Sequence, residues 1–139
     1  IISSHLERRV AMNNLLLDGL IVEPTEHPYE VNIINDKDIV EFNIVDDISD
    51  VCKIKILRIS KSACIIYNKC ALLSQNNANR KINNTIIAGT FYIAGINKHG
   101  RLASLTDKQK KKYTEKFWET EIFTEDEIIN AQLENLFDA

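Results

Sequence analysis

The sequence has few of the residues and motifs that mark several large protein classes. Its 139 residues include four glycines, two prolines and three cysteines, and no apolar run approaches the roughly 18 residues that a membrane-spanning helix needs. No signal peptide is evident. An odd cysteine count without C-x-x-C or zinc spacing predicts reduced, buried thiols in a cytoplasmic protein. There is also no Walker loop and no nucleophile elbow, so the common signatures of phosphate-loop and hydrolase enzymes are absent.

The most informative absence is that of acidic residues from the middle of the chain. All 20 Asp and Glu residues lie outside residues 51–105. An anionic partner, either a nucleotide or a nucleic acid, is the functional interpretation of such a basic block. The alternative is that the acidic flanks pack against a basic sheet and neutralise it. The nine cations of the block are Lys53, Lys55, Arg58, Lys61, Lys69, Arg80, Lys81, Lys98 and Arg101.

Residues 85–95 predict the central strand of a β-sheet. The stretch is uncharged and rich in β-branched and aromatic residues, with apolar side chains at both odd and even positions. Gly89 within it predicts a bulge or a close approach of another group. The acidic stretch 35–50 fits either a helix or a strand, and the polar stretch 74–84 is predicted to be a loop. Further strands are predicted at 15–23, 29–34, 51–60, 63–67 and 70–73.

The C-terminal part changes to helical spacing. Thr106 with Gln109 and Thr124 with Glu127 each fit a capping box, which predicts two helices within residues 106–139. The predicted fold class is therefore α+β, a mainly antiparallel sheet of about six strands followed by two C-terminal helices. We expect one domain over 15–139, with the sheet at 15–96, preceded by an N-terminal extension at 1–14.

The sequence contains few residue patterns that could carry out catalysis. We therefore expect that the protein is not an enzyme and that it binds no metal or cofactor. The three histidines lie in turn-like or terminal contexts, and no base is placed beside a cysteine. For binding, arginine offers a fork for phosphate and an aromatic ring offers a face for a base. The alternative is that the aromatic residues are core. The candidate ligand-binding residues are Asn79, Arg80, Gly89, Thr90, Phe91, Tyr92 and Arg101.

The chain contains an ordered set of short motifs. They are Leu-Ile-Val-Glu-Pro (20–24), Pro-Tyr-Glu-Val (28–31), Ile-Ile-Tyr-Asn-Lys (65–69), Asn79-Arg80, Ile-Ile-Ala-Gly-Thr-Phe (86–91) and Ser-Leu-Thr-Asp-Lys-Gln (104–109), followed by Tyr113 and Phe117. This set resembles a small protein family that is found in phages, prophages and conjugative elements of Gram-positive bacteria and is known only as a domain of unknown function. The resemblance covers about residues 15–117, and the chain departs from the family pattern at 46–50. It implies an accessory protein of a mobile element and carries no catalytic residues.

Three functional hypotheses follow. In outline the chain is similar to viral anti-Thoeris sponge proteins, which implies a non-enzymatic counter-defence protein that sequesters a cyclic nucleotide signal such as a cyclic ADP-ribose derivative. Such a protein is expected to be a homodimer or higher oligomer. The second hypothesis is an inhibitor that binds a host defence enzyme through the acidic face at 35–50. The third is direct nucleic-acid binding through the basic block and the cationic helix start at 108–112.

Overall fold

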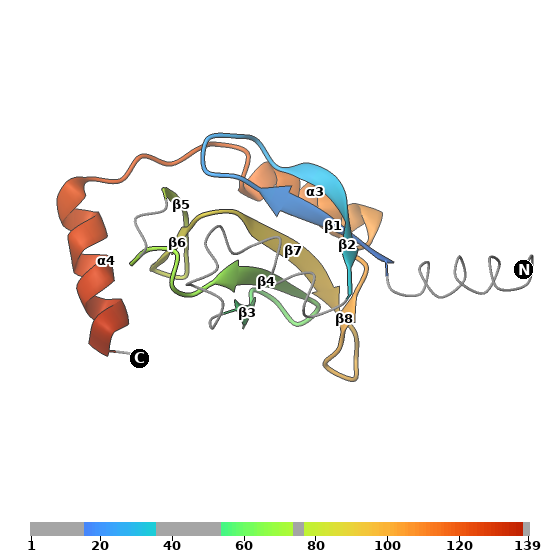
Figure 1. Cartoon of the computed structure of the whole chain (residues 1–139). Coiled ribbons are helices and arrows are strands. Elements are labelled where there is room, and N and C mark those ends of the chain that lie inside the picture. Colours follow the sequence, from blue (N-terminus) through green and yellow to red (C-terminus); the bar gives the residue numbers. More distant parts are fainter. Residues whose placement is uncertain (1–15, 36–53, 74–76, 138–139) are drawn as a thin grey trace, which may run out of the picture.

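The computed structural model describes residues 16–35, 54–73 and 77–137, so the predicted extension at 1–14 and most of the acidic stretch 35–50 lie outside the described residues. Within these ranges the chain forms an antiparallel sheet of six strands in the order β2-β1-β7-β4-β3, with β8 paired to β7 (Figure 1). The strands are β1 (Leu16–Val22), β2 (Tyr29–Ile34), β3 (Ile54–Arg58), β4 (Ala63–Asn68), β7 (Phe91–Ile96) and β8 (Leu102–Ala103).

The predicted central strand is confirmed in its second half and corrected in its first. β7 lies between β1 and β4, with Phe91 and Ile93 buried on one face and Ala94 and Ile96 on the other. The strand does not begin at residue 85, because the chain changes direction at Gly89, where φ is +71°. Glycine adopts this left-handed conformation without a side-chain clash, so the residue separates two strands of different sheets.

The polar stretch predicted as a loop instead contains a strand. β5 (Ala78–Ile82) pairs with β6 (Thr85–Ala88) in a separate two-stranded sheet. Asn83 and Asn84 join them with φ of 49° and 67°. Positive φ at both central residues is typical of a type I′ hairpin turn, and asparagine tolerates it. The asparagine content therefore marked the turn of a hairpin.

The strand predicted at 70–73 is also wrong. The Ala71 N–H donates to the Asn68 carbonyl oxygen at 3.1 Å, which closes a turn after β4. Ala71 and Leu72 are buried against Ala88 of β6. Apolar content alone could not distinguish a short buried turn from a short strand.

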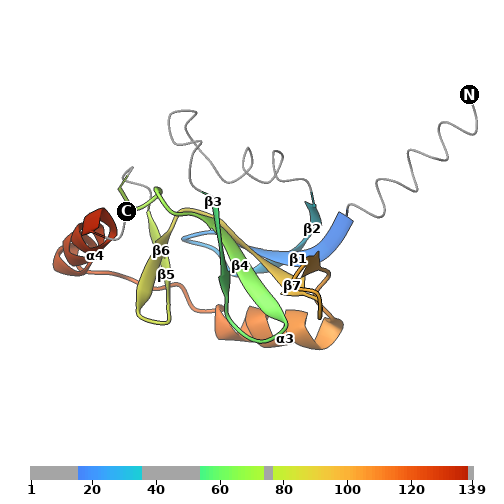
Figure 2. The same cartoon turned by 90° about the horizontal axis from the view of Figure 1, so that it is seen from below.

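Two helices follow the sheet, as predicted. α3 (Asp107–Lys116) begins at the capping box of Thr106 and Gln109, and α4 (Glu125–Phe137) begins after Thr124, whose hydroxyl accepts from the Glu127 N–H. α3 crosses one face of the sheet, whereas α4 lies beyond the β5–β6 hairpin (Figures 1 and 2). The described structure is thus an α+β fold, which confirms the predicted class.

The main core lies between the sheet and α3. Leu20, Ile65, Phe91 and Ile93 from the sheet pack with other buried side chains there, which include Tyr113 and Phe117 from the α3 region. No helix in the described ranges is long and apolar enough to cross a membrane.

Candidate functional site

Arg80, the first of the predicted phosphate contacts, lies in the interior. It is the largest side chain with no exposed area. Its guanidinium donates to the backbone oxygens of Phe117 and Glu26, both at 2.9 Å, and to that of Pro24 at 3.2 Å. Burial lowers the pKa of Arg80, since removal from water disfavours the charged form. The side chain therefore joins β5 to the turn at 24–26 and to the end of α3, and its guanidinium faces backbone oxygens inside the protein.

The neighbouring candidates are also packed inward. The Asn79 amide donates to the oxygens of Val22 and Gly89 at 2.9 and 2.8 Å, and its own oxygen accepts from Arg80. Phe91 has no exposed area and meets Phe117 edge to face. Phe91 therefore belongs to the hydrophobic core, which was the alternative to a role in stacking a base.

The remaining candidates lie apart. Thr90 and Tyr92 are half-buried, and Tyr92 belongs to the face opposite α3, where burial raises its pKa. Arg101 is exposed in the connection from β7 to β8, at the other end of the sheet from β5 (Figure 1). The structure brings Asn79, Arg80, Gly89 and Phe91 together as interior packing, and it leaves Arg101 outside that cluster.

A different hollow gathers side chains of the acid-free block. It has a volume of about 280 Å³, near the lower limit of about 300 Å³ for small-molecule sites. Every lining residue among those that the structure describes falls within 51–105, so none of these is acidic. We call it the lysine pocket; its lining residues are Lys55, Leu57, Tyr67, Asn68, Lys69, Leu72, Thr85, Ile86 and Ala88.

Asn68 supplies the most specific group in the lysine pocket. The residue is 2% exposed, and its side-chain oxygen accepts from the Cys70 N–H at 2.9 Å. This bond fixes the amide orientation, because an N–H donor must face the oxygen. The opposite atom, Nδ2, is buried and has no hydrogen-bond partner among the described residues. An unmade hydrogen bond of this kind costs about 1–3 kcal/mol, so an acceptor placed beside this nitrogen would be stabilising.

Two lysines flank that amide. Lys69 follows it in the turn, and Lys55 lies directly across the β3–β4 pair from Tyr67. Neither lysine makes an ion pair with a carboxylate in the described part of the chain. Burial raises the pKa of Tyr67, which keeps its phenol neutral at physiological pH. Two uncompensated cations and a free amide donor therefore favour an anionic oxygen.

The apolar wall of the lysine pocket is supported by α4. Leu72, Ile86 and Ala88 line the pocket and pack on their other side with Ile128 and Ala131 of the helix. In addition, the Gln132 amide donates to the Leu72 oxygen at 3.1 Å. The pocket thus has one polar and one aliphatic side.

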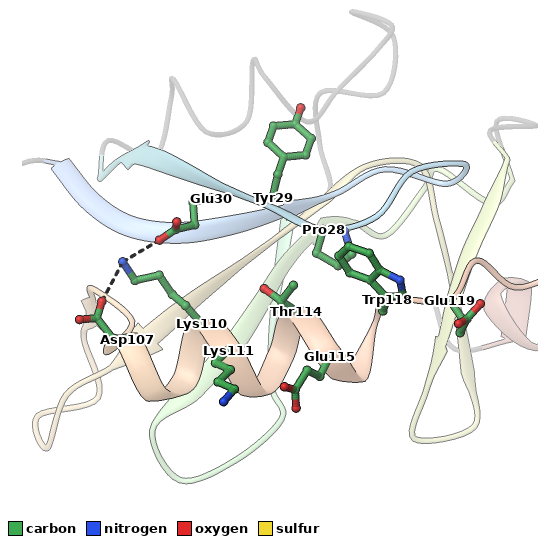
Figure 3. A pocket seen from close by; sticks show the side chains of 10 residues that line it. All are labelled: Pro28, Tyr29, Glu30, Asp107, Lys110, Lys111, Thr114, Glu115, Trp118 and Glu119. Carbon is green, nitrogen blue, oxygen red and sulfur yellow. Dashed lines mark ion pairs between the residues drawn. The ribbon is translucent and has the colours of Figure 1, made fainter.

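A larger hollow lies between β2 and α3 and differs in charge (Figure 3). We call it the aromatic groove. Its volume is about 900 Å³, and it holds four carboxylates against two lysines. Its lining residues are Pro28, Tyr29, Glu30, Asp107, Lys110, Lys111, Thr114, Glu115, Trp118 and Glu119.

Three of the six charged side chains of the aromatic groove form one ion-pair cluster. The Lys110 ammonium lies 2.9 Å from the Glu30 carboxylate and 3.3 Å from that of Asp107, as Figure 3 shows. At the other end, the ring of His27 stacks on Trp118 with centroids 3.9 Å apart, and its Nδ1 lies 2.6 Å from the Trp118 oxygen. This net-negative groove does not favour a phosphate.

Reasoning from the sequence missed Asn68, Lys55 and Lys69 as site residues. The acid-free block was the signal that contained them, and the Asn68–Lys69 turn was predicted only as a connection. Among the described residues, no group of three or more His, Cys, Asp or Glu side chains is arranged to hold a metal ion.

Most of the chain matches the model of a known protein family. The family is described as a domain of unknown function, DUF3846, and its model matches residues 17–118. This agrees with the extent of the resemblance drawn from residues 15–117, and it leaves α4 outside the matched part. No curated protein and no solved structure matches the chain.

Proposed function

The chain belongs to the DUF3846 family, whose description names no activity, and on that premise we propose that it binds a small phosphate-bearing molecule in the lysine pocket. The single observation that carries this proposal is the buried Nδ2 of Asn68, which has no partner among the described residues, in a pocket that two lysines and no described carboxylate line. Phosphate oxygens accept hydrogen bonds from amide and ammonium groups, which makes them suitable partners for these donors.

The two sides of the lysine pocket favour a phosphate attached to an apolar group. Lys55, Lys69 and Asn68 contact the anion, while Leu72 and Ile86 offer aliphatic surface to a sugar or base. A volume of about 280 Å³ accepts a phosphoryl group and part of its substituent, so a larger nucleotide extends beyond the rim. The ligand class is thus a nucleotide or a sugar phosphate.

The role of this binding is sequestration without chemistry. No group in the lysine pocket pairs a nucleophile with a base, since its polar side chains are two lysines, a tyrosine, an asparagine and a threonine. The finer form of the proposal is a mobile-element protein that holds a cyclic nucleotide signal, such as a cyclic ADP-ribose derivative, as a homo-oligomer. That form rests on the resemblance drawn from the sequence.

Calorimetric titration of the full chain tests the proposal. Inorganic phosphate, AMP, ADP-ribose, cyclic ADP-ribose and a cyclic dinucleotide are titrated at low ionic strength. We expect at least one nucleotide to bind more tightly than phosphate alone, because the aliphatic wall adds contact. Absence of binding by every compound would refute the proposal.

Matched lysine variants localise the binding. Lys55→Gln and Lys69→Gln should each weaken binding of the best compound about 5- to 30-fold, as loss of one charge-assisted hydrogen bond of about 1–2 kcal/mol implies. Lys81→Gln and Lys111→Gln remove the same charge outside the lysine pocket and should leave the affinity unchanged. Equal losses in all four variants would indicate general electrostatic attraction and contradict a built site.

A further inference from the structure

The β3–β4 connection and the β7–β8 connection lie at the end of the sheet away from α4 (Figures 1 and 2). These two connections, together with the last residue of β3, carry a second group of cations. These two turns are neighbours because the Ile96 N–H donates to the Ser62 oxygen at 2.9 Å. We call the group the basic end; its members are Arg58, Lys61, Lys98 and Arg101.

The two turns that carry the cations of the basic end are stabilised by hydrogen bonds and by contacts with each other. The Arg58 guanidinium contacts the Lys61 oxygen at 3.5 Å and lies beside Gly100 of the second turn, 3.8 Å from where a Cβ would stand. The Asn97 side-chain oxygen accepts from the N–H groups of His99 and Arg101 at 2.9 and 3.1 Å. The two turns therefore present their cations from fixed backbones.

The positive charge of the basic end is not compensated by ion pairs. Within residues 16–35, 54–73 and 77–137, the ion pairs found involve only Lys110. The four cations are exposed. Residues 117–139 carry seven carboxylates and no Lys or Arg, and α4 within this segment lies at the opposite end of the molecule (Figure 2). A protein with a net charge of −3 thus carries a strong charge asymmetry, and one end attracts polyanions.

We propose that the basic end binds the sugar–phosphate backbone of a nucleic-acid duplex. Polar residues lie beside the cations, among them Ser60, Ser62 and Asn97, whose hydroxyl, amide and backbone groups suit phosphate oxygens. No aromatic ring except that of His99 lies on the two turns, so the stacking platform that single strands require is missing. Lysine and arginine side chains neutralise phosphates without reading base edges, which makes the binding independent of sequence.

This surface is independent of the function proposed for the lysine pocket. β3 and β4 run between the two, with Lys55 and Asn68 at one end of the strand pair and Arg58 and Lys61 at the other. A failure of either proposal leaves the other standing, because different side chains carry each of them.

Fluorescence anisotropy of a labelled DNA duplex of about 20 base pairs, titrated with the full chain, tests the proposal. We expect binding at low salt that weakens as salt rises, with a slope of log affinity against log salt of about −3 to −4 for four neutralised phosphates. Two duplexes of unrelated sequence should bind equally. Absence of binding at low salt would overturn the proposal, as would tighter binding of a single strand.

A pair of double variants with equal net charge separates the basic end from general attraction. Lys61→Gln/Arg101→Gln should reduce the magnitude of the salt slope by about 2 and weaken low-salt binding at least tenfold. Lys81→Gln/Lys116→Gln should change neither quantity, since both residues lie outside the basic end. Equal effects of the two double variants would refute the basic end as the binding surface. The same conclusion would follow if duplex binding were lost only in Lys55→Gln/Lys69→Gln, which changes the lysine pocket.

Discussion

The two hollows of this protein, the aromatic groove and the lysine pocket, differ in whether their lysines form ion pairs. In the aromatic groove, Lys110 is shared by two carboxylates, and His27 and Trp118 stack against each other. In the lysine pocket, neither lysine forms an ion pair and the Asn68 Nδ2 has no hydrogen-bond partner among the described residues. The larger hollow thus contains an ion-pair cluster, whereas the smaller one contains lysines and an amide nitrogen that have no such partner among the described residues.

The largest expected effect comes from replacing Arg80, whose hydrogen bonds hold the backbone beside the His27–Trp118 stack. Arg80 donates to the oxygens of Phe117 and Glu26, which immediately precede Trp118 and His27. Arg80→Met should lower the free energy of unfolding by about 3–5 kcal/mol, because it leaves several buried carbonyls without a donor. Urea denaturation measures the loss, and the fluorescence of the single tryptophan reports release of the stack.

Arg101→Met is the matched control for that experiment. It removes the same charge from an exposed turn, and the expected stability change is within about 0.5 kcal/mol. Similar losses in the two variants would contradict the internal role of Arg80.

The second prediction concerns the lysine pocket, where the Asn68 hydrogen-bond donor is replaced by a negatively charged acceptor. Asn68→Asp keeps an oxygen for the Cys70 N–H and replaces the free donor with a carboxylate. Phosphate affinity should fall at least tenfold, about 1.4 kcal/mol or more, because the new oxygen repels the anion. Asn32→Asp makes the same charge change at an exposed position on β2 and should have no such effect. Unchanged affinity in Asn68→Asp would exclude the amide from the site.

The third prediction compares one tyrosine in each hollow by pH titration. Burial raises the pKa of Tyr67 in the lysine pocket, and burial together with Glu23 raises that of Tyr29 at the groove. Each folded form holds its proton more tightly than the unfolded chain does, so the stability contributed is present below pH about 10 and is lost as the pH rises above it.

Bound phosphate should sharpen the difference between these tyrosines. A nearby anion disfavours the phenolate, so phosphate should raise the pKa of Tyr67 further and leave Tyr29 unaffected. Ultraviolet titration of Tyr67→Phe and Tyr29→Phe, with and without phosphate, assigns the change. A phosphate effect that persists in Tyr67→Phe would place the anion elsewhere.

The smallest expected effect comes from the ion pairs of the groove. The hydrogen bond to Glu30 is the main cause that raises the pKa of Lys110, yet the side chains of Glu30 and Asp107 are well exposed. Lys110→Gln should therefore cause only a slight destabilisation that disappears in high salt, because surface ion pairs are weak and screened. Urea denaturation at two salt concentrations checks this, with Lys111→Gln as the unpaired control. A large loss that is insensitive to salt would show that Lys110 has a packing role.

Much of the fold could be predicted from local sequence, and the site could be predicted only as a region. The capping boxes at Thr106 and Thr124 fixed both helix starts, because each depends on side chains three residues apart. The hairpin at 78–88 was not predicted, since its asparagines indicated a loop and the left-handed turn they form joins strands of a separate sheet. Asn68 could not be identified because the hydrogen bonding of its amide depends on what surrounds it in three dimensions.

By itself, the sequence determined that residues 51–105 contain nine cations and no acid, and that this block forms most of a sheet. Only the tertiary structure decided which cations face inward and which face outward. Arg80 is internal because three carbonyls, 37 to 56 positions away along the chain, converge on its guanidinium. Lys55 and Lys69 remain available because no described carboxylate lies within ion-pair distance of them. Charge is a property of composition, but the availability of a charge depends on long-range packing, which one-dimensional spacing does not encode.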